Sequence, residues 1–552
     1  MRKMLTILLL SLAIGTSAQD KDHNLEVAKN LEVFNTIYKH LDMLYVDTLD
    51  AREVIGNAIN GMLRSLDPYT VYYPEDKANE LHTMLTGKYA GIGSIIRWNS
   101  QLRNSVIEEP YEGMPAAEVG LKKGDVILSI DGESMVGKAN DYVSQHLRGD
   151  AGTTFELKVR RPSTGREMRF KVTRRAIKMP AVPYYGVRPG GVGYIKLNEF
   201  TEDCAKMVRN AFIEMRHQGI RGLVLDLRNN VGGAEQEAVN LVNLFVPKGV
   251  TVVSNRGKMK RTNHAYKTTA EPIDTVMPIV VLVNGGTASS AEITAGALQD
   301  LDRAVIMGTK TYGKGLVQMP IDLPYNGEMK LTTNRYYIPS GRCIQAIRYR
   351  HADGGSSEEV ADSATRRFYT AGGREVRDGG GIKPDVVAEA DSLPNIAYYL
   401  AAARDSNEVL LNYEIDYIAR HATIAPADQF ELSDEDYADF CRRVLSSGFT
   451  YDRTSERVVK ELESITRFEG YYDDAKAEIE ALKKKLSHNV AKDLEINRQS
   501  LKDIITNDLV TAYYYQRGAA QNALRHDRQM DEAVKLVTDS QRYASILAPA
   551  KR

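Results

Sequence analysis

The sequence is poor in the residues that mark several common protein classes. Among 552 residues there are only three cysteines, Cys204, Cys343 and Cys441, which is too few for a disulfide framework. None of them lies near a second cysteine or a histidine at the spacing of metal ligands. We therefore expect all three cysteines to be structural or incidental, and we predict no metal site and no cofactor.

An excess of charge of one sign is also missing. The chain has 72 basic and 73 acidic residues, so its charge predicts neither a nucleic-acid partner nor binding to an anionic membrane surface. After residue 18 there is no apolar run long enough for a membrane-spanning helix. We therefore predict a protein without a stable membrane span.

The first 18 residues are typical of a secretory signal peptide. Arg2 and Lys3 give a positive start, residues 5–14 (LTILLLSLAI) form an apolar core, and small residues end at Ala18. An apolar core of about ten residues is too short to span a bilayer as a stable helix. We predict cleavage after Ala18 and an exported, periplasmic protein; an uncleaved anchor is the weaker alternative.

What the sequence does contain is most informative over residues 284–318, NGGTASSAEITAGALQDLDRAVIMGTKTYGKGLVQ. The apolar run 278–283 predicts a buried strand, the following Asn-Gly-Gly a turn, and the next residues a helix through residue 299 with Glu292 in its first turn. Ser289 and Ser290 fall where the turn becomes the helix, near free backbone N–H groups and the positive end of the helix dipole. An oxyanion would be stabilised there.

A lysine follows on the next predicted loop. Residues 304–308 (AVIMG) predict a strand, and Lys314 lies between two glycines after it. A lysine can activate a serine hydroxyl if burial lowers its pKa. The stretch can therefore hold a nucleophile and a base without histidine, although a capping serine pair with a surface lysine is the plainer interpretation. A phosphate-binding loop is disfavoured, because GTKTYGK is followed by Gly315 and a strand-like segment.

The same stretch resembles the core of the C-terminal processing peptidases, also called tail-specific proteases. Their pattern N-x-x-S-A-S-A-S-E-[IL] corresponds to NGGTASSAEI here, and T-[FY]-G-K-G-x-[VS]-Q corresponds to TYGKGLVQ. The resemblance implies that Ser289 is the nucleophile and that Lys314, 25 residues later, is the base. It implies that Gln318 orients the lysine. Ser290 is the second candidate for the nucleophile.

A second part of that core follows the apolar strand predicted at residues 222–227. The residues RNNVGG at 228–233 resemble the family's D-L-R-x-N-x-G-G, which implies that Gly232 and Gly233 offer backbone N–H groups to an oxyanion hole. The backbone N–H of Ser290 would be the second donor. Repeated strand–helix units predict layered α/β packing. The resemblance sharpens this prediction to a ClpP/crotonase-like core of β-β-α repeats at residues 179–390.

Residues 89–178 resemble a PDZ domain. Gly91-Ile92-Gly93-Ser94-Ile95 takes the place of the loop that receives a peptide's terminal carboxylate on its backbone N–H groups. The downstream residues GLKKGDVILSIDG strengthen the resemblance. It implies that protein or peptide substrates with free C-termini are the partners. The alternative is a small β domain with no ligand.

Both ends of the chain are predicted to be helical, over residues 24–88 and 391–552. Ala475, Ile479, Leu482 and Leu486 recur at four-three-four steps, which is typical of a helix-packing seam. We expect this seam to pack within the chain more readily than against a partner. The helical termini also allow a homo-oligomer.

The signal peptide and the family resemblance together predict a secreted, α/β multidomain serine endopeptidase. The resemblance implies a serine–lysine dyad supported by glutamine. Two alternatives remain open. One is an inactive PDZ scaffold that only binds peptides. The other is a serine–histidine hydrolase of the tricorn type, with His217 or His264 as the base.

Overall fold

A computed structural model describes residues 18–77, 88–178, 180–350, 356–389, 393–402, 408–451, 453–486 and 489–549. All of the predicted signal peptide except Ala18 lies outside these ranges. The chain divides into a smaller unit of residues 1–75, 320–331 and 349–357 and a larger unit of all the others. None of the described helices is both long enough and apolar enough to cross a bilayer.

The first segment of the smaller unit has two helices and one short strand, and its other two segments carry parts of strands described below. It contains α1 (Ala18–Leu44) and α2 (Ala51–Arg64), and Asp50 caps α2 by accepting from the N–H groups of Arg52 and Glu53. Strand β1 (Val71–Tyr73) pairs antiparallel with the first residues of β18 (Glu328–Tyr337). The helical prediction for residues 24–88 is therefore wrong at residues 71–73. Asp67-Pro68 ends the helical pattern there, and Val-Tyr-Tyr favours a strand.

In the larger unit, the PDZ domain consists of a β-sheet, with five strands in consecutive order and one more strand paired to it, and two short helices. Strand β3 is at one edge of the order β3-β4-β5-β7-β8, β6 pairs with β5, and β2 pairs with β9. The elements are β2 (Lys88–Gly91), β3 (Ser94–Asn99), β4 (Asn104–Pro110), α4 (Pro115–Glu118), β5 (Val126–Ile130), β6 (Glu133–Ser134), α5 (Asn140–Leu147), β7 (Thr154–Arg161), β8 (Arg166–Thr173) and β9 (Arg175–Lys178).

The peptidase core is built on a six-stranded sheet of order β10-β11-β12-β15-β16-β23, parallel except for the β10–β11 pair. Helices α6, α7 and α8 cover one face with a large apolar core. The elements are β10 (Tyr184–Arg188), β11 (Val192–Lys196), α6 (Cys204–His217), β12 (Gly222–Asp226), α7 (Glu235–Asn243), β15 (Ile279–Val283), α8 (Ser290–Asp300), β16 (Val305–Gly308) and β23 (Val386–Val387).

A second, antiparallel sheet and short hairpins complete the core. Strand β18 pairs with β13, with β17 and, through its first residues, with β1. Strand β13 also pairs with β14. Pairs β19–β20 and β21–β22 stand apart from it. The elements are β13 (Thr251–Gly257), β14 (His264–Lys267), β17 (Leu316–Asp322), β19 (Ile347–Arg350), β20 (Ser356–Glu359), β21 (Arg367–Tyr369) and β22 (Glu375–Arg377).

The C-terminal region is helical, as predicted. A first group of helices forms its own core, with aromatic side chains such as Tyr413 and Phe440 at its centre. Three of the four residues of the predicted seam pack within one hairpin: Ala475, Ile479 and Leu486 join a cluster with Val459 of α12. Leu482 is outside this cluster and is 38% exposed. The helices are α9 (Asn395–Ala397), α10 (Val409–Arg420), α11 (Asp434–Ser446), α12 (Thr454–Glu469), α13 (Tyr472–Lys485), α14 (Val490–Ile496) and α15 (Arg498–Ala523), with a π-helical turn at Tyr398–Ala402.

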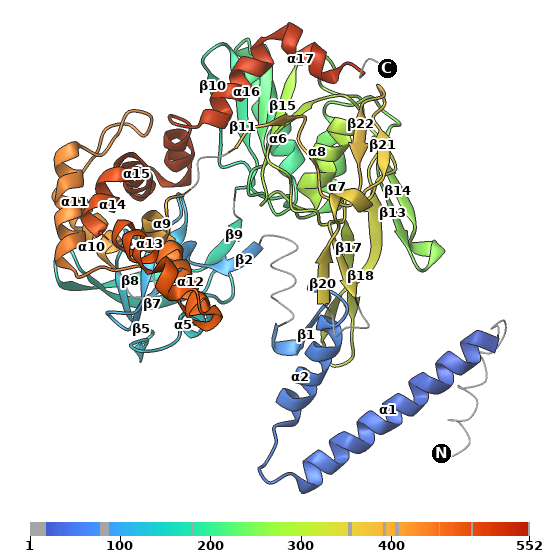
Figure 1. Ribbon diagram of the computed structural model, residues 1–552, viewed down its shortest axis with the longest axis horizontal. Helices are drawn as coiled ribbons and strands as arrows, with labels where there is room; N and C mark the ends of the chain where they lie inside the picture. The colour runs from blue at the N-terminus through green and yellow to red at the C-terminus, as the bar shows by residue number, and fades with distance from the viewer. Residues whose placement is uncertain are drawn as a thin grey trace. The chain divides into compact units, whose positions relative to one another are not determined.

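The last two helices, α16 (Arg528–Thr538) and α17 (Ser540–Leu547), leave that group and lie against the peptidase sheet (Figure 1). Met530, Leu536 and Val537 pack on Val224 and Val280 of strands β12 and β15. The far end of the chain thus covers the second face of the peptidase sheet.

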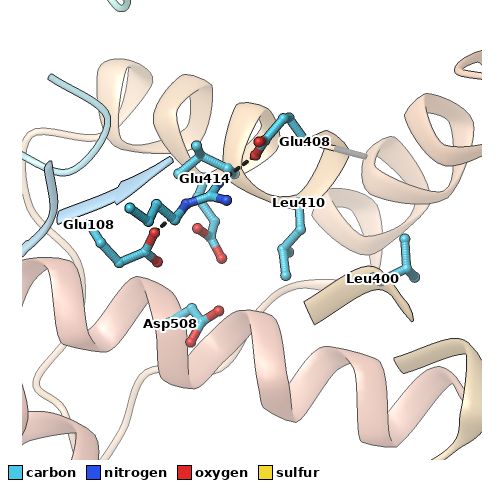
Figure 2. A pocket seen from close by; sticks show the side chains of 8 residues that line it. Glu108, Leu400, Glu408, Leu410, Glu414 and Asp508 are labelled. Carbon is cyan, nitrogen blue, oxygen red and sulfur yellow. Dashed lines mark hydrogen bonds and ion pairs between the residues drawn. The ribbon is translucent and has the colours of Figure 1, made fainter. Parts of the chain in front are cut away.

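Helices α10 and α15 meet the PDZ domain through a small apolar patch and a cluster of charges. Leu411 and Ile415 of α10 pack on Val106 and Val126 of the PDZ sheet. Beside them Arg97 contacts Glu108 and Glu408, and Asp508 faces the same pocket (Figure 2). The PDZ domain is therefore attached to the helical region largely through buried charges.

Carboxyl groups outnumber cations in this cluster. Lys123 Nζ lies 2.8 Å from Glu414 Oε2 and 3.6 Å from Glu108 Oε1. Burial alone would lower the pKa of Lys123, but Glu414, Asp508 and Glu108 outweigh it and raise that pKa. Burial raises the pKa of Glu414, against the pull of Lys123. Glu109 stands nearby, with both carboxyl oxygens bonded to Gln516 Nε2 at 2.7 and 2.6 Å.

The predicted fold class is confirmed. The chain has a helical N-terminal segment, a PDZ domain, a mixed α/β peptidase core and a helical C-terminal region. The exact domain boundaries stay predictions.

Candidate active site

Ser289 is the N-cap of α8, at the turn between β15 and that helix. The predicted strand, turn and helix are thus confirmed. Its backbone has φ 54° and ψ −120°, which is unfavourable for a residue with a Cβ. A serine on a strained strand-to-helix turn resembles the nucleophile elbow of other hydrolases, where the turn exposes the hydroxyl. Ser289 is partly exposed.

Ser290 differs from its neighbour in both exposure and bonding. It is only 1% exposed, and its Oγ donates to the carbonyl oxygen of Gly233 at 2.8 Å. Its hydroxyl therefore joins α8 to the glycine turn and is not turned toward solvent.

Glu292, in the first turn of α8, connects the serine turn to the lysine loop. Its Oε2 accepts from the backbone N–H of Ser289 at 2.9 Å and of Lys314 at 2.9 Å. Because both nitrogens bond one oxygen atom, they lie no more than about 6 Å apart. Its Oε1 accepts from Thr311 Oγ1 and from the N–H of Gly313 at 2.7 Å.

Burial raises the pKa of Glu292 to about 7, although the four hydrogen bonds oppose the rise. The side chain has no exposed surface, so its charge lacks water and depends on these donors. The sequence identified Glu292 only as an acid in a helix's first turn. Its contacts with the lysine loop depend on residues about 20 positions away, which no local pattern shows.

Lys314 lies on the loop between β16 and β17, as the sequence predicted, and is partly buried. Gln318 follows on β17, where its Nε2 donates to Thr332 Oγ1 at 3.1 Å. Thr332 lies on β18, so Gln318 contacts the neighbouring strand. Its orienting effect on the lysine stays a prediction.

Tyr336 of β18 also reaches both loops, and the sequence analysis did not find it. Its hydroxyl lies 2.7 Å from the carbonyl oxygen of Lys314 and 3.3 Å from that of Ser289. Its backbone N–H donates to the carbonyl oxygen of Gly315 at 3.1 Å. A tyrosine in a β-strand carries no sequence signal for this role.

The glycine turn approaches the serines closely. At Gly232, which has φ +97°, an added Cβ would lie 2.7 Å from the Cβ of Ser289 and 2.8 Å from the nitrogen of Ser290. At Gly233 it would lie 2.4 Å from the carbonyl oxygen of Phe200. Only glycine fits at either position. The N–H of Gly232 donates to Asn230 Oδ1 at 2.9 Å, so that donor is engaged, and the oxyanion role of the pair stays a prediction.

Arg228 begins the same turn and is held by the C-terminal region. Its guanidinium contacts Asp226 at 2.6 Å and Asp527, the N-cap of α16, also at 2.6 Å. A cavity of about 540 Å³ beside these residues is also lined by Lys196 and Gln516. The sequence analysis did not connect Asp527 with the site, because about 300 residues separate it from Arg228.

The two histidines of the alternative mechanism lie elsewhere on the core. His217 is the exposed last residue of α6, and His264 is exposed on β14 with its ring against Tyr266. Neither makes a hydrogen bond to Ser289 in the part of the chain that the structure describes. Within those same residues, no group of three or more histidine, cysteine or acidic side chains is arranged to hold a metal ion.

The predicted carboxylate loop of the PDZ domain joins β2 to the edge strand β3. The carbonyl oxygens of Ile92 and Gly93 accept from the N–H groups of Ala116 and Tyr111. Gly91 ends β2. Ser94 Oγ donates to the carbonyl oxygen of Glu109 at 2.9 Å or of Ile95 at 3.0 Å. Ile95 is 41% exposed on the edge strand.

Family models match most of the chain. "Peptidase family S41" matches residues 191–351, "PDZ domain" residues 106–161, "Probable PDZ-protease, C-terminal helical domain" residues 396–537, and "Activating protease CtpB N-terminal domain" residues 11–77.

Two sequence relatives give the same assignment. The chain is 37% identical over 323 residues to a carboxy-terminal-processing protease of Bartonella bacilliformis. The aligned region covers 58% of this chain and 73% of that protein. It is 34% identical over 322 residues to a probable CtpA-like serine protease of Staphylococcus aureus, covering 57% and 62%. A solved photosystem II D1 C-terminal processing protease is 28% identical over 65% of this chain and 88% of that one, with a TM-score of 0.37. The chain thus belongs to peptidase family S41, in its carboxy-terminal-processing group, and is a serine-type peptidase.

Proposed function

We propose that the protein is an exported endopeptidase in which Ser289 is the nucleophile and Lys314 is the general base. The hydroxyl of Ser289 attacks the substrate carbonyl carbon and its proton passes to Lys314 Nζ. The lysine then gives this proton to the leaving amine, and water hydrolyses the acyl-enzyme by the same route. A free lysine has a pKa of roughly 10.4, so the mechanism needs a site that favours its neutral form.

The observation that carries this proposal is the bond of one Glu292 oxygen to the N–H groups of both Ser289 and Lys314. It fixes the nucleophile and base loops to one another. The engaged hydroxyl of Ser290 supports Ser289 as the reacting serine. Gln318 orients the lysine in this mechanism. The oxyanion hole is formed by the Ser290 N–H with that of Gly232 or Gly233, and the Gly232 N–H must leave Asn230 to take this part.

The test is cleavage of casein by single variants of the full chain. Ser289→Ala and Lys314→Ala should each abolish cleavage and fluorophosphonate labelling, with unchanged circular dichroism. Ser290→Ala is the matched control and should keep labelling. Labelling that survives in Ser289→Ala but not in Ser290→Ala would move the nucleophile by one residue. Loss in His217→Ala or His264→Ala with an active Lys314→Ala would favour a histidine base.

We further propose that the PDZ domain captures unstructured C-termini of substrates. The support is the position of Ile92 and Gly93 beside β3, the edge strand of the sheet, which pairs only with β4 among the described residues. A peptide can add there as a strand, with its carboxylate at the loop. In the inactive Ser289→Ala chain, amidating the peptide should weaken binding about ten- to a hundredfold, since a charge-assisted bond contributes roughly 1.5–3 kcal/mol. Equal affinity for acid and amide forms would argue against this.

We also propose that the protein is exported to the periplasm and that it forms a homo-oligomer. Residues 1–18 would direct export to the periplasm, which N-terminal sequencing of the mature protein tests: a start at Gln19 is expected. Helix α1 leaves Leu31, Phe34 and Ile37 between 44% and 59% exposed, which supports a homo-oligomer through the helical termini. Replacing all three by serine should convert the oligomer to monomer in analytical ultracentrifugation.

A further inference from the structure

The hydroxyl of Tyr336 contacts the backbone carbonyl oxygens of Ser289 and Lys314, whose N–H groups are bonded by Glu292. Glu292 accepts from the N–H groups of Ser289 and Lys314, whereas the Tyr336 hydroxyl approaches their carbonyl oxygens. The N–H and the C=O of one residue belong to the two peptide units that flank its Cα, so bonding both restrains the backbone on either side of the side chain. The two side chains together therefore fix the backbone from which the serine and lysine side chains project.

The strand carrying Tyr336 is well placed to act as this support. Tyr336 is 1% exposed, and β18 is paired with β13 at this point, where Tyr336 lies opposite Asn255. Its backbone N–H binds Gly315 on the lysine loop. The hydroxyl thus projects from a rigid sheet and not from another loop.

The hydroxyl is the part of this side chain that needs explaining. A phenylalanine would fill nearly the same apolar space, and a buried hydroxyl is unfavourable unless it is hydrogen-bonded. Here the shorter contact is to Lys314 and the longer one to Ser289, at 2.7 and 3.3 Å. One proton between two acceptors makes a three-centre hydrogen bond that joins the loops directly.

We infer that Tyr336 is a positioning residue for the peptidase reaction, acting through the backbone carbonyls of Ser289 and Lys314. This inference rests on the proposed serine–lysine mechanism. Loosening either loop lengthens the path for the proton between the two side chains, and a misplacement of about 1 Å can reduce a rate by about a hundredfold. Substrate capture by the PDZ domain, as proposed above, uses another surface and should change little.

The test compares Tyr336→Phe with Tyr337→Phe in the full chain. Tyr337 is the next residue of β18 and stacks its ring on Arg256, so it controls for loss of a tyrosine hydroxyl from this strand. Tyr336→Phe should lower kcat on casein about tenfold or more with KM within about twofold, and should slow fluorophosphonate labelling by the same factor. Tyr337→Phe should match the parent enzyme in both assays.

A second measurement separates positioning from general loss of stability. In the inactive Ser289→Ala background, Tyr336→Phe should speed amide exchange at Gly313 and Lys314 about tenfold, while exchange in strand β15 stays unchanged. Parent-level kcat, labelling and exchange in Tyr336→Phe would overturn the inference. Equal acceleration of exchange throughout the core would overturn it too, by showing a structural role only. Full activity in Ser289→Ala would instead reject the proposed mechanism.

Discussion

Two contacts of the C-terminal region differ in their chemistry. Helix α16 attaches to the peptidase sheet through Met530, Leu536 and Val537, all nearly inaccessible to solvent. Helix α10 attaches to the PDZ domain with only a small apolar patch, beside a charge cluster that includes Lys123 and Glu414. The first contact buries apolar surface, which is insensitive to pH and weakly sensitive to salt. The second depends on the protonation of buried carboxyl groups.

The difference in chemistry indicates which of the two contacts can open while the rest of the protein stays folded. The peptidase sheet needs α16 as part of its core, so that contact is permanent while the protein is folded. The PDZ domain has its own core around Ile107 and Leu157, so we expect it to fold without α10. We therefore expect the PDZ contact to open under conditions that leave the peptidase core intact.

Removing the cation from the charged contact should have the largest effect. Lys123→Met leaves Glu414 and Glu108 buried without this partner, and breaking a buried ion pair costs about 3–5 kcal/mol. Amide exchange should rise at the α10 face of the PDZ sheet while the peptidase core stays protected. Lys122→Met, at the exposed neighbouring residue, is the control. Simultaneous opening of both regions would contradict the comparison.

A truncation in the apolar contact should act on the whole core. Leu536 has no exposed surface, so Leu536→Ala should reduce the free energy of unfolding by about 2–5 kcal/mol. The loss should be the same at pH 6 and pH 8 and at low and high salt in urea titrations. The exposed neighbour Lys535→Ala should change stability by no more than about 0.5 kcal/mol. A strong salt dependence of the Leu536 effect would refute the apolar description.

Replacing Asp527 tests the ion pair between the N-cap of α16 and Arg228, which lies beside the apolar contact. Asp527→Ala removes a partner of Arg228 and a helix cap, and a hydrogen bond to a charged group contributes about 1.5–3 kcal/mol. We expect reduced casein cleavage, because Arg228 begins the glycine turn beside Ser289. Asp539→Ala removes the cap of α17 without touching Arg228 and should keep activity. Equal activity of the two variants would limit Asp527 to a capping role.

The pH response of the PDZ contact is the smallest expected effect. The pKa of Glu414 is raised by burial, so the docked state favours the protonated acid. Its contribution is fully present below the ordinary glutamate pKa, about 4.5, and is lost as pH rises through the raised pKa. Lys123 opposes this rise, so we expect a smaller loss of protection than in Lys123→Met. Exchange at the PDZ face, after correction for the intrinsic pH dependence of amide exchange, should rise with pH, and Glu414→Gln should flatten that rise.

The site illustrates how far sequence patterns reach. The strand, turn and helix around Ser289 and the loop position of Lys314 were predicted from apolar runs, turn residues and family spacing, and the structure has them. The contacts that join the two segments were not predicted. Glu292 was assigned to a helix terminus, and Tyr336 was not identified. The lysine loop lies about 20 residues from each of them along the chain, beyond the reach of a local pattern.

The chain's local chemistry determined where its elements begin and end, since the signals lie within a few residues of one another. Apolar runs set the strands, Asn-Gly-Gly and the glycine pair set the turns, and spaced apolar residues set the helices. Tertiary structure alone decided that Ser290 is engaged by Gly233, that Glu292 and Tyr336 each contact the backbone of both Ser289 and Lys314, and that α16 covers the peptidase sheet. These contacts join residues brought together by sheet pairing and apolar burial, which depend on the whole chain and not on any local segment.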